Sequence, residues 1–263
     1  MPELPEVETT RLKLRPHLAG RRIEDFFSTW PRRVFPSRAA VRRTLAGSRV
    51  AGVDRHGKRL LLELDSGQVV GLGLGMTGNL EWADGLPPDR RHLRHRFRLD
   101  RGWLLFFDAR KFGRVMLFAD AAAARAGLGP DALDRRLRPG RFRARLASRR
   151  AIKTVLLDQK VIAGVGNIYS DEALFRAGIR PATPAARIGP VRAGRLLEAL
   201  RRVLRESIRR QGTSFDWAWP GGRMQYHLMV YGRAGEPCRR CGAGIRSLRL
   251  GGRSSCYCPR CQR

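Results

Sequence analysis

Lysine and acidic residues are scarce in this chain. Of its 263 residues, 53 are Lys or Arg and only 23 are Asp or Glu, which gives a formal net charge of +30. Just five of the basic residues are lysine, and the rest are arginine. A positive excess of this size goes beyond what solubility requires. It predicts a polyanionic partner, either a nucleic acid or an anionic membrane surface.

Long apolar runs and a secretory leader are also missing. The longest apolar run lies around residues 69–76, far short of the roughly 20 residues that a membrane-spanning helix needs. Residues 1–6 are acidic, whereas a signal peptide begins with positive charge. These absences favour nucleic acid over a membrane as the partner and predict a cytoplasmic, nucleoid-associated protein. The length of the chain favours about two domains.

The chain has five cysteines, and four of them form two CxxC pairs separated by sixteen residues: Cys238, Cys241, Cys258 and Cys261. This spacing is typical of two knuckles that close on one tetrahedral zinc ion. Such a zinc ion is structural, because four thiolates leave no open coordination position for chemistry. A reduced or disulfide-bonded cluster is the alternative. Cys256 is interpreted as a bystander or a small buried side chain.

The first half of the chain reads as one helix followed by strands. Apolar residues recur with a helical period from Leu4 to Leu18, interrupted at Arg11, and the pattern stops at Gly20. Strand-like segments follow at 23–30, 49–55, 59–64, 69–74, 96–99, 103–107 and 115–118. Tight turns at 65–67 and 100–102 join neighbouring strands as hairpins. This pattern predicts an antiparallel β-sandwich or barrel that carries one helix.

The second half reads as helical until the cysteine pairs. Residues 119–148 are rich in Ala, Gly, Pro and Arg and are interpreted as a linker with some helix. Helical periodicity follows at 152–157, 168–177 and 191–209. The predicted class is α+β. The predicted domains are an N-terminal domain (1–118), a linker (119–148), a helical domain (149–232) and a zinc finger (233–263).

Several short motifs, taken together, identify a family. They are PELPEVE at residues 2–8, GMTG at 75–78, DARKFG at 108–113, GVGNIY at 164–169, VYGR at 230–233 and the cysteine pairs. In this order, from residue 2 to 262, they resemble bacterial formamidopyrimidine-DNA glycosylases, the Fpg/MutM type of the Fpg/Nei family. The resemblance implies an N-terminal β-sandwich, a helix-two-turn-helix domain, a zinc-finger hairpin, and DNA bound between the two main domains.

The resemblance also implies an activity. Such enzymes remove oxidised purines, chiefly 8-oxoguanine and formamidopyrimidines, and then cut the abasic strand by β,δ-elimination. The implied partner is double-stranded DNA containing oxidised bases, and the implied state is a monomer. Two alternatives stay open: an endonuclease VIII-like enzyme for oxidised pyrimidines, against which Leu4, Arg110 and Phe112 argue, and a non-catalytic zinc-containing DNA-binding protein, against which the Pro2-Glu3 start argues.

Pro2 is the predicted nucleophile. Cutting a glycosidic bond and then the strand requires an amine that forms an imine at C1′. An α-amine has a pKa near 7.7–8.0, against about 10.4 for lysine, so more of it is the free nucleophile at neutral pH. Removal of Met1 would free the secondary amine of Pro2, whose iminium carries a permanent charge. Taken alone, Pro2 is also an ordinary helix-starting proline.

Three further residues are assigned near the chemistry through the resemblance. Glu3 is the acid/base that protonates the sugar oxygen and assists ring opening. Lys58, at the turn into an apolar strand, contacts the DNA phosphate near the reacting sugar, although a solvated lysine is the ordinary interpretation. Arg253, in the zinc hairpin, is grouped with these residues as a phosphate contact. Glu6 either holds the site or contacts the lesion, and the alternative is a solvated carboxylate that suits the helix dipole.

Met76, Arg110 and Phe112 match the residues that fill the gap left by an everted base. Extruding a base from a duplex costs a few kcal/mol, and something must replace it. A thioether, a guanidinium for the orphaned cytosine and an aromatic wedge suit that task. In another context Met76 and Phe112 would be interpreted as core residues.

Asn167 and Lys153 are the predicted phosphate contacts of the helical domain. Asn167 follows a glycine-rich loop and precedes a helix, whose backbone amides can hold a phosphate. An ordinary Asn N-cap is the alternative interpretation, and the two can coexist. The resemblance adds Lys153 at the start of a preceding helix.

The chain departs from the family pattern in two places. Gly73 stands where many relatives have a histidine, which removes a phosphate contact. Residues 217–229 do not follow the usual sequence of the loop that covers the everted base, so the lesion preference stays open. Trp217, Trp219 and Tyr226 in this loop either stack on a base or pack the loop down, and packing is slightly favoured.

Overall fold

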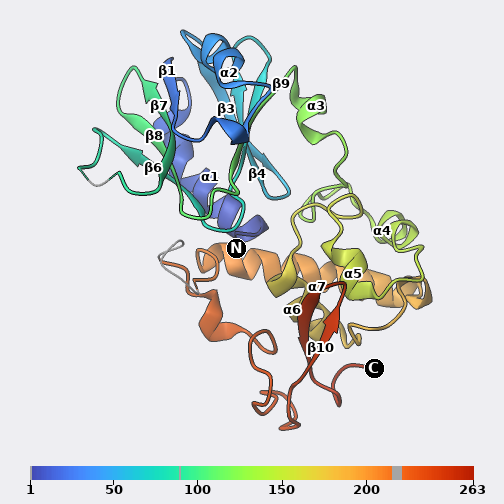
Figure 1. Cartoon of the computed structure of the whole chain (residues 1–263). Coiled ribbons are helices and arrows are strands. Elements are labelled where there is room, and N and C mark those ends of the chain that lie inside the picture. The colour runs from blue at the N-terminus through green and yellow to red at the C-terminus, as the bar shows by residue number, and fades with distance from the viewer. Residues whose placement is uncertain (1, 89, 215–220) are drawn as a thin grey trace. The chain divides into compact units, whose positions relative to one another are not determined.

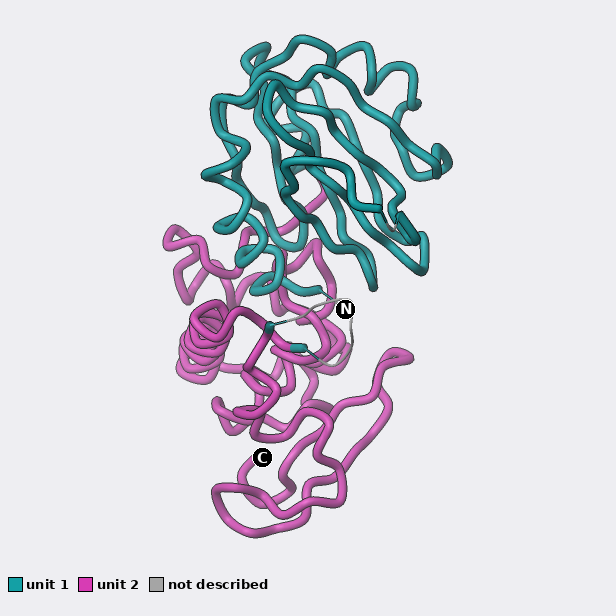
Figure 2. The backbone as a smooth tube through the Cα atoms, turned by 90° about the vertical axis from the view of Figure 1, so that its left-hand side faces the viewer, with its two compact units in different colours: residues 1–126, 214–221 teal, residues 127–213, 222–263 magenta. Residues whose placement is uncertain are grey.

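The computed structural model of the chain describes residues 2–88, 90–214 and 221–263. These residues form two compact units (Figure 2). Unit 1 comprises residues 1–126 and 214–221, and unit 2 comprises residues 127–213 and 222–263. Among the helices of the described ranges, none is both long enough and apolar enough to cross a membrane.

Unit 1 is a β-sandwich with a leading helix (Figure 1). One sheet has the order β1-β7-β8-β6, and the other has the order β2-β9-β5-β4-β3. The pairs are antiparallel except β2 with β9. The elements are α1 (Leu4–Leu18), β1 (Ile23–Ser28), η1 (Pro31–Arg33), β2 (Val34–Phe35), α2 (Arg38–Leu45), β3 (Val50–His56), β4 (Arg59–Leu64), β5 (Val69–Gly73), β6 (Gly78–Ala83), β7 (Leu93–Leu99), β8 (Trp103–Asp108), β9 (Arg114–Phe118) and α3 (Ala121–Arg125). The predicted antiparallel sandwich is confirmed.

The middle of the larger sheet is buried on both faces. On one side, Leu60, Leu62 and Val70 join the main core of the sandwich. On the other side, Leu61 and Val69 pack with α3 in a second cluster. Burial on both faces explains why these strands read as continuous apolar runs rather than alternating ones.

Helix α1 continues through the interruption of its apolar period. At Arg11 the guanidinium donates to Glu8 Oε1 at 2.6 Å, so the charged residue is accommodated on the helix surface. The apolar residues of α1 are buried at Val7, Leu14 and Leu18, as the period predicts.

Four elements of unit 1 were not predicted: η1, β2, α2 and β6. The β2 strand has two residues. The α2 helix has eight residues, of which only Val41 and Leu45 are buried. The β6 strand lies at the edge of its sheet and reads GNLEWA, in which Leu80 is the one buried large apolar side chain. Short or edge elements bury too little apolar surface to leave a clear period in the sequence.

Unit 2 is helical and ends in a two-stranded hairpin (Figure 1). Its elements are α4 (Pro139–Arg145), α5 (Ile152–Leu157), α6 (Asn167–Ala177), η2 (Ala185–Arg187), α7 (Pro190–Arg209), η3 (Met224–His227), β10 (Arg246–Leu250) and β11 (Arg253–Tyr257). The helix α7 packs against α4 and α6 and buries one face along its length. The predicted helices coincide with α5, α6 and α7 within one residue. The 119–148 segment carries α3 and α4, and Phe142 and Leu146 in it are buried.

Glu8 connects α1 to β3. It accepts from Arg11 and from Arg55, whose Nε lies 3.0 Å from Glu8 Oε2. Burial raises the pKa of Glu8, but the two guanidinium groups outweigh it and hold the pKa below its ordinary value of 4.5. A carboxyl with a depressed folded-state pKa stabilises the fold above its unfolded pKa, and this contribution is lost as the pH falls through the folded pKa.

We therefore expect Glu8→Gln to lower the free energy of unfolding by about 1–3 kcal/mol at pH 7. The difference from the unsubstituted protein should shrink as the pH falls through the lowered pKa of Glu8, because both side chains are then neutral. Urea unfolding at pH 7 and across a series of acidic pH values measures this. Glu198→Gln is the control, since that carboxylate pairs with Arg202 on the exposed surface, at 3.7 Å. A loss for Glu8→Gln that does not change with pH would contradict the ion-pair explanation.

Candidate active site, nucleic-acid contacts and zinc centre

Pro2 and Glu3 lie directly before α1, and both are buried. Glu3 is the N-cap of the helix, with extended backbone angles, and Pro5 stands in the first turn. The N–H of Glu3 donates to Glu6 Oε2 at 2.8 Å, which is one half of a capping box. Glu6, 2% exposed, therefore fixes the backbone on which Pro2 and Glu3 sit. The contact by which Glu6 caps the helix therefore also holds the backbone of Glu3 in place.

Lys58 stands in the turn between β3 and β4 and is half-buried. The turn closes through Gly57, whose φ of 59° favours glycine. Arg55 Nη1 donates to the carbonyl of Gly57 at 3.0 Å, while its Nε donates to Glu8. The Arg55 side chain thus links the turn that carries Lys58 to the helix that follows Pro2 and Glu3.

A buried carboxylate, Asp108, joins the two loops expected to enter the DNA. It is 2% exposed at the end of β8. The Thr77 hydroxyl donates to its Oδ1 at 2.6 Å, and the N–H of Arg110 donates to the same atom at 3.2 Å. The N–H of Gly113 donates to Oδ2 at 2.7 Å. Asp108 belongs to a motif that the sequence identified, but its role as the anchor was missed.

Arg110, Phe112 and Met76 lie on these two loops. Arg110 is exposed, and its guanidinium carbon lies 5.2 Å from the centre of the Phe112 ring. Phe112 is 42% exposed, so the core interpretation is wrong for this residue. Met76 is half-buried. The loops touch at Gly75, where an added Cβ would lie 2.8 Å from the carbonyl carbon of Phe112.

In unit 2 a second buried carboxylate, Asp171 on α6, binds groups from α5 and β11. Lys153 Nζ lies 2.7 Å from Asp171 Oδ1, and both side chains are 0% exposed. Ser255 Oγ and the N–H of Cys256, both on β11, donate to the same carboxylate at 2.5 and 2.8 Å. Burial raises the pKa of Asp171, and the Lys153 ammonium and the other donors oppose this shift. Lys153 also donates to the carbonyl of Asn167 at 2.7 Å.

The sequence assigned Lys153 a phosphate contact and did not reveal its buried partner Asp171. Its ammonium is directed to Asp171 and to the first residue of α6. Any effect of Lys153 on a phosphate at this helix end is therefore exerted through the position of α6 in this structure.

Asn167 is the first residue of α6, and the N-cap is Gly166. The alternative interpretation of Asn167 as an N-cap is therefore wrong. Its Oδ1 is buried and accepts no hydrogen bond from the described residues. The preceding loop is held by Gln159, whose Nε2 donates to the carbonyl of Val165 at 2.8 Å and whose Oε1 accepts from the N–H of Gly164 at 2.9 Å. Gln159 was not identified from the sequence.

Arg253 is exposed at the start of β11. The turn before it contains Gly251 and Gly252, both with positive φ, as a tight hairpin requires. An added Cβ at Gly251 would lie 3.2 Å from Thr154 Cγ2, so the tip of the hairpin packs on α5 beside Lys153. Lys153, Asn167 and Arg253 thus belong to one packed region of unit 2.

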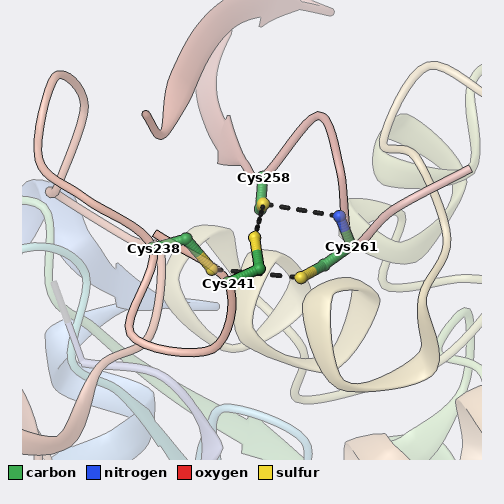
Figure 3. A group of neighbouring side chains, drawn as sticks. All are labelled: Cys238, Cys241, Cys258 and Cys261. Atoms are coloured by element: carbon green, nitrogen blue, oxygen red, sulfur yellow. Dashed lines mark hydrogen bonds between the residues drawn. The ribbon is translucent and has the colours of Figure 1, made fainter. Parts of the chain in front are cut away.

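The four paired cysteines converge, as Figure 3 shows. Their sulfur atoms all lie within 4.8 Å of one another. Cys241 and Cys258 are 3.5 Å apart, and Cys238 and Cys261 are 4.0 Å apart. Burial and the neighbouring thiols raise the pKa of Cys261 to about 12. Four thiolates at this spacing need a bound cation, and sulfur donors in a tetrahedral set fit one structural zinc ion. The disulfide alternative is wrong, because all five cysteines are free.

Cys256 lies outside this group. It is 7% exposed and packs in the small core of the finger with Phe175 and Val230. Its interpretation as a small buried side chain is confirmed.

Glu172 anchors the segment that enters the finger. Its buried carboxylate accepts from the N–H groups of Met229, Val230 and Tyr231 at 2.9–3.0 Å. Burial raises the pKa of Glu172, and these three donors oppose the shift. The VYGR motif is thereby fixed on α6, a connection that the sequence did not reveal.

The structure describes only some of the residues at which the chain departs from the family pattern. Gly73 ends β5 and is half-buried. Trp217 and Trp219 lie outside the described residues. Tyr226 is 70% exposed on η3, so the packing interpretation is wrong for this side chain.

Comparison with known proteins covers the whole chain. The formamidopyrimidine-DNA glycosylase N-terminal domain matches residues 1–115, the corresponding H2TH domain matches 128–217, and the zinc finger found in FPG and IleRS matches 235–263. Formamidopyrimidine-DNA glycosylase from Methylococcus capsulatus is 44% identical over 274 residues, with 100% of both chains covered. Formamidopyrimidine-DNA glycosylase from Chloroflexus aurantiacus is 42% identical, with 100% of this chain and 98% of that protein covered.

Solved structures agree with the sequence relatives. The Lactococcus lactis enzyme bound to DNA with an AP site superimposes with a TM-score of 0.92 at 32% identity, over 100% of both chains. A MutM complex with DNA containing carbocyclic 8-oxo-G gives 0.91 at 33% identity, again over 100% of both chains. These matches define a zinc-containing DNA glycosylase of base excision repair. The chain belongs to the formamidopyrimidine-DNA glycosylase family.

We expect Cys238→Ser or Cys261→Ser to release the zinc ion, because three thiolates and a hydroxyl bind it less tightly. Cys256→Ser should keep one zinc ion per chain, since its sulfur is outside the cluster. Metal analysis of the purified proteins measures the content. Loss of zinc from the Cys256 variant would show that the ligand set is different.

Proposed function

We propose that this protein is a bifunctional DNA glycosylase and AP lyase that removes oxidised purines, chiefly 8-oxoguanine and formamidopyrimidines. The observation that carries the proposal is the pair Pro2 and Glu3, fixed at the start of α1 in a chain that matches its family from end to end. The named relatives are formamidopyrimidine-DNA glycosylases, and their solved complexes contain AP-site or 8-oxo-G DNA.

In this proposal the amine of Pro2, freed by removal of Met1, attacks C1′ of the damaged nucleotide. The C1′–N bond breaks, and its electron pair leaves with the base, which takes up a proton. Glu3 protonates the sugar oxygen and assists opening of the ring to the iminium. The charged iminium then accepts the electrons released when a proton leaves C2′, and the 3′ phosphate is expelled. Loss of a proton from C4′ in the resulting conjugated iminium then expels the 5′ phosphate.

Lys58 is proposed to hold the phosphate beside the reacting sugar. A half-buried ammonium in a fixed turn loses less conformational entropy on binding than a free surface lysine does. The Arg55 link between this turn and α1 supports the assignment, because it couples the position of Lys58 to that of the catalytic residues.

Met76, Arg110 and Phe112 are proposed to fill the gap left by the everted base. Their common anchor on Asp108 supports this role, since a wedge must be rigid to hold a duplex open. Arg110 is exposed and offers donors in a plane, as recognition of the cytosine edge requires.

Asn167, the amides of the α6 N-terminus, Lys153 and Arg253 are proposed to grip the DNA backbone. A side-chain amide can rotate so that its NH₂ group takes the place of the oxygen, and the unsatisfied position at Asn167 is suited to a phosphate contact. Lys153 serves this grip by holding α6, and Arg253 by direct contact. The domain roles proposed are catalysis for 1–118, linkage for 119–148, DNA binding for 149–232 and a zinc finger for 233–263.

The proposed partner is double-stranded DNA that contains oxidised bases. The protein is proposed to bind it as a monomer, at the nucleoid. One chain carries all the assigned residues, and its charge of +30 suits a polyanion. Excision rates on duplexes with 8-oxoguanine, formamidopyrimidine or dihydrouracil test the lesion class. Preference for dihydrouracil would instead support the endonuclease VIII-like function.

The imine predicts a covalent complex. Borohydride should trap the protein on 8-oxoguanine or abasic DNA, because it reduces the imine to a stable amine. Mass spectrometry of the digested complex should place the link on Pro2, at the start of the mature chain. A link at Lys58, or full lyase activity with Met1 retained, would exclude Pro2 as the nucleophile and with it this mechanism.

Two variants should separate the recognition of the lesion in the duplex from the removal of the base. Arg110→Ala should slow excision of 8-oxoguanine opposite cytosine roughly ten- to a hundredfold, which corresponds to about 1–3 kcal/mol, and should slow cleavage of a preformed abasic site less. Glu3→Gln should impair base removal strongly and leave duplex affinity nearly unchanged, since it removes an acid. Equal losses on both substrates would mean that Arg110 only holds the DNA.

A further inference from the structure

Unit 1 contains a cavity that the proposed mechanism does not use. It has a volume of about 350 Å³ and lies beside β1, β7 and the first turns of α2. Phe26, Phe27 and Leu93 supply apolar surface, and Ser28 and His95 supply polar atoms. This volume is within the usual range of sites for small organic molecules, about 300–1,000 Å³.

Arginine dominates the wall of this cavity. Five arginines line it, and none of the described residues in its wall is acidic: Arg38, Arg42, Arg90, Arg94 and Arg96. Arg42 is neutralised by Asp25, which accepts from its Nε at 2.6 Å and from its Nη2 at 2.8 Å. Arg38 makes no ion pair with any described residue. The cavity therefore carries excess positive charge and suits an anion.

Arginine and aromatic side chains lie beside one another from the cavity across the sheet. The guanidinium of Arg96 lies 4.6 Å from the Phe27 ring centre and 5.8 Å from that of Trp103. The guanidinium carbon of Arg42 also lies 5.8 Å from the centre of the Phe27 ring. Arg96 Nε is buried and donates no hydrogen bond to the described residues. Planar guanidinium and aromatic groups offer surfaces on which a heterocyclic ring can stack.

His95 contributes no positive charge here. Its Nδ1 lies 2.9 Å from Ser28 Oγ, and the side chain is 2% exposed. Burial lowers the pKa of His95 to about 4, against an opposing effect of Asp108 and with a further lowering by Arg94. The ring is therefore neutral at pH 7, and the attraction for an anion comes from the arginines.

We propose that this cavity binds a nucleotide, with its base stacked against Phe27 and Arg96 and its phosphate held by Arg38. An inorganic anion would satisfy the charge of Arg38 but leave the aromatic surface uncovered. An uncharged aromatic molecule would leave the charge of Arg38 without a partner. A nucleotide carries both groups, and it can come either as a free mononucleotide or as one unit of a single strand.

The test is calorimetric titration of the full-length protein with deoxyguanosine monophosphate, with a thymidine pentanucleotide and with inorganic phosphate. Binding of the mononucleotide indicates that the ligand is a free nucleotide. Binding of the pentanucleotide alone indicates that the ligand is one unit of a single strand. Both results support a nucleotide site, provided that the variants below weaken them.

Arg38→Ala and Arg96→Ala should each weaken nucleotide binding at least about fivefold, the loss expected for a phosphate contact or a stacking surface. Arg43→Ala is the matched control on α2, and Arg98→Ala, whose partner is Glu24, is the control on β7. Neither control residue lines the cavity, so binding should stay within about twofold. Arg96→Lys keeps the charge but loses the plane, so it should also weaken binding. Arg38 is exposed, so its variant tests the site even if Arg96→Ala unfolds.

Three results would overturn the proposal. The first is no measurable binding of either nucleotide probe. The second is binding that Arg38→Ala and Arg96→Lys leave unchanged, which would place the nucleotide at another site. The third is inorganic phosphate binding as tightly as the mononucleotide, which would show a plain anion site without recognition of the base.

Discussion

Buried carboxylates that accept backbone N–H bonds hold the functional loops of both units in place. Asp108 ties the two loops of unit 1, and Asp171 and Glu172 tie the hairpin and the finger segment to α6. Glu6 does the same for the N-terminal residues before α1. Removing such a carboxylate leaves several buried donors unpaired, each at a cost of about 1–3 kcal/mol. The precision of the candidate site therefore depends on a few acids that never touch the DNA in the proposed mechanism.

This use of acids explains how a chain with 53 basic and 23 acidic residues keeps ordered loops. Flexible basic loops would repel one another, since arginine side chains cannot lose their charge. Here Asp108, Asp171 and Glu172 each accept from several donors at once, backbone amides among them. Within the described ranges, exposed arginines such as Arg38, Arg110 and Arg253 make no ion pair with a carboxylate, and they can meet phosphate groups.

The sequence predicted the elements that have a strong period and the residues that belong to motifs. It located β4 and α5 to the residue and the zinc ligands by spacing alone. It could not predict β6 or α2, which bury few side chains, nor the contacts of Asp108, Gln159 and Glu172. Those contacts join residues across the fold, and a hydrogen bond to a distant backbone amide leaves no periodic trace in the chain. For the same reason the sequence did not reveal the buried ion pair between Lys153 and Asp171.

The arginine surplus has a second structural use besides contact with phosphate. On the outer part of the β1–β7 sheet, Arg42 and Arg96 lie over Phe27, and Arg96 extends to Trp103. Lysine would not form such a layer, because its ammonium is compact and strongly hydrated, whereas a guanidinium is planar and weakly hydrated. A composition of 48 arginines and five lysines thus makes flat cationic surfaces available that a lysine-rich chain of equal charge would lack. The cavity beside Phe27 follows from this chemistry, since stacking sites and positive charge arise there from the same side chains.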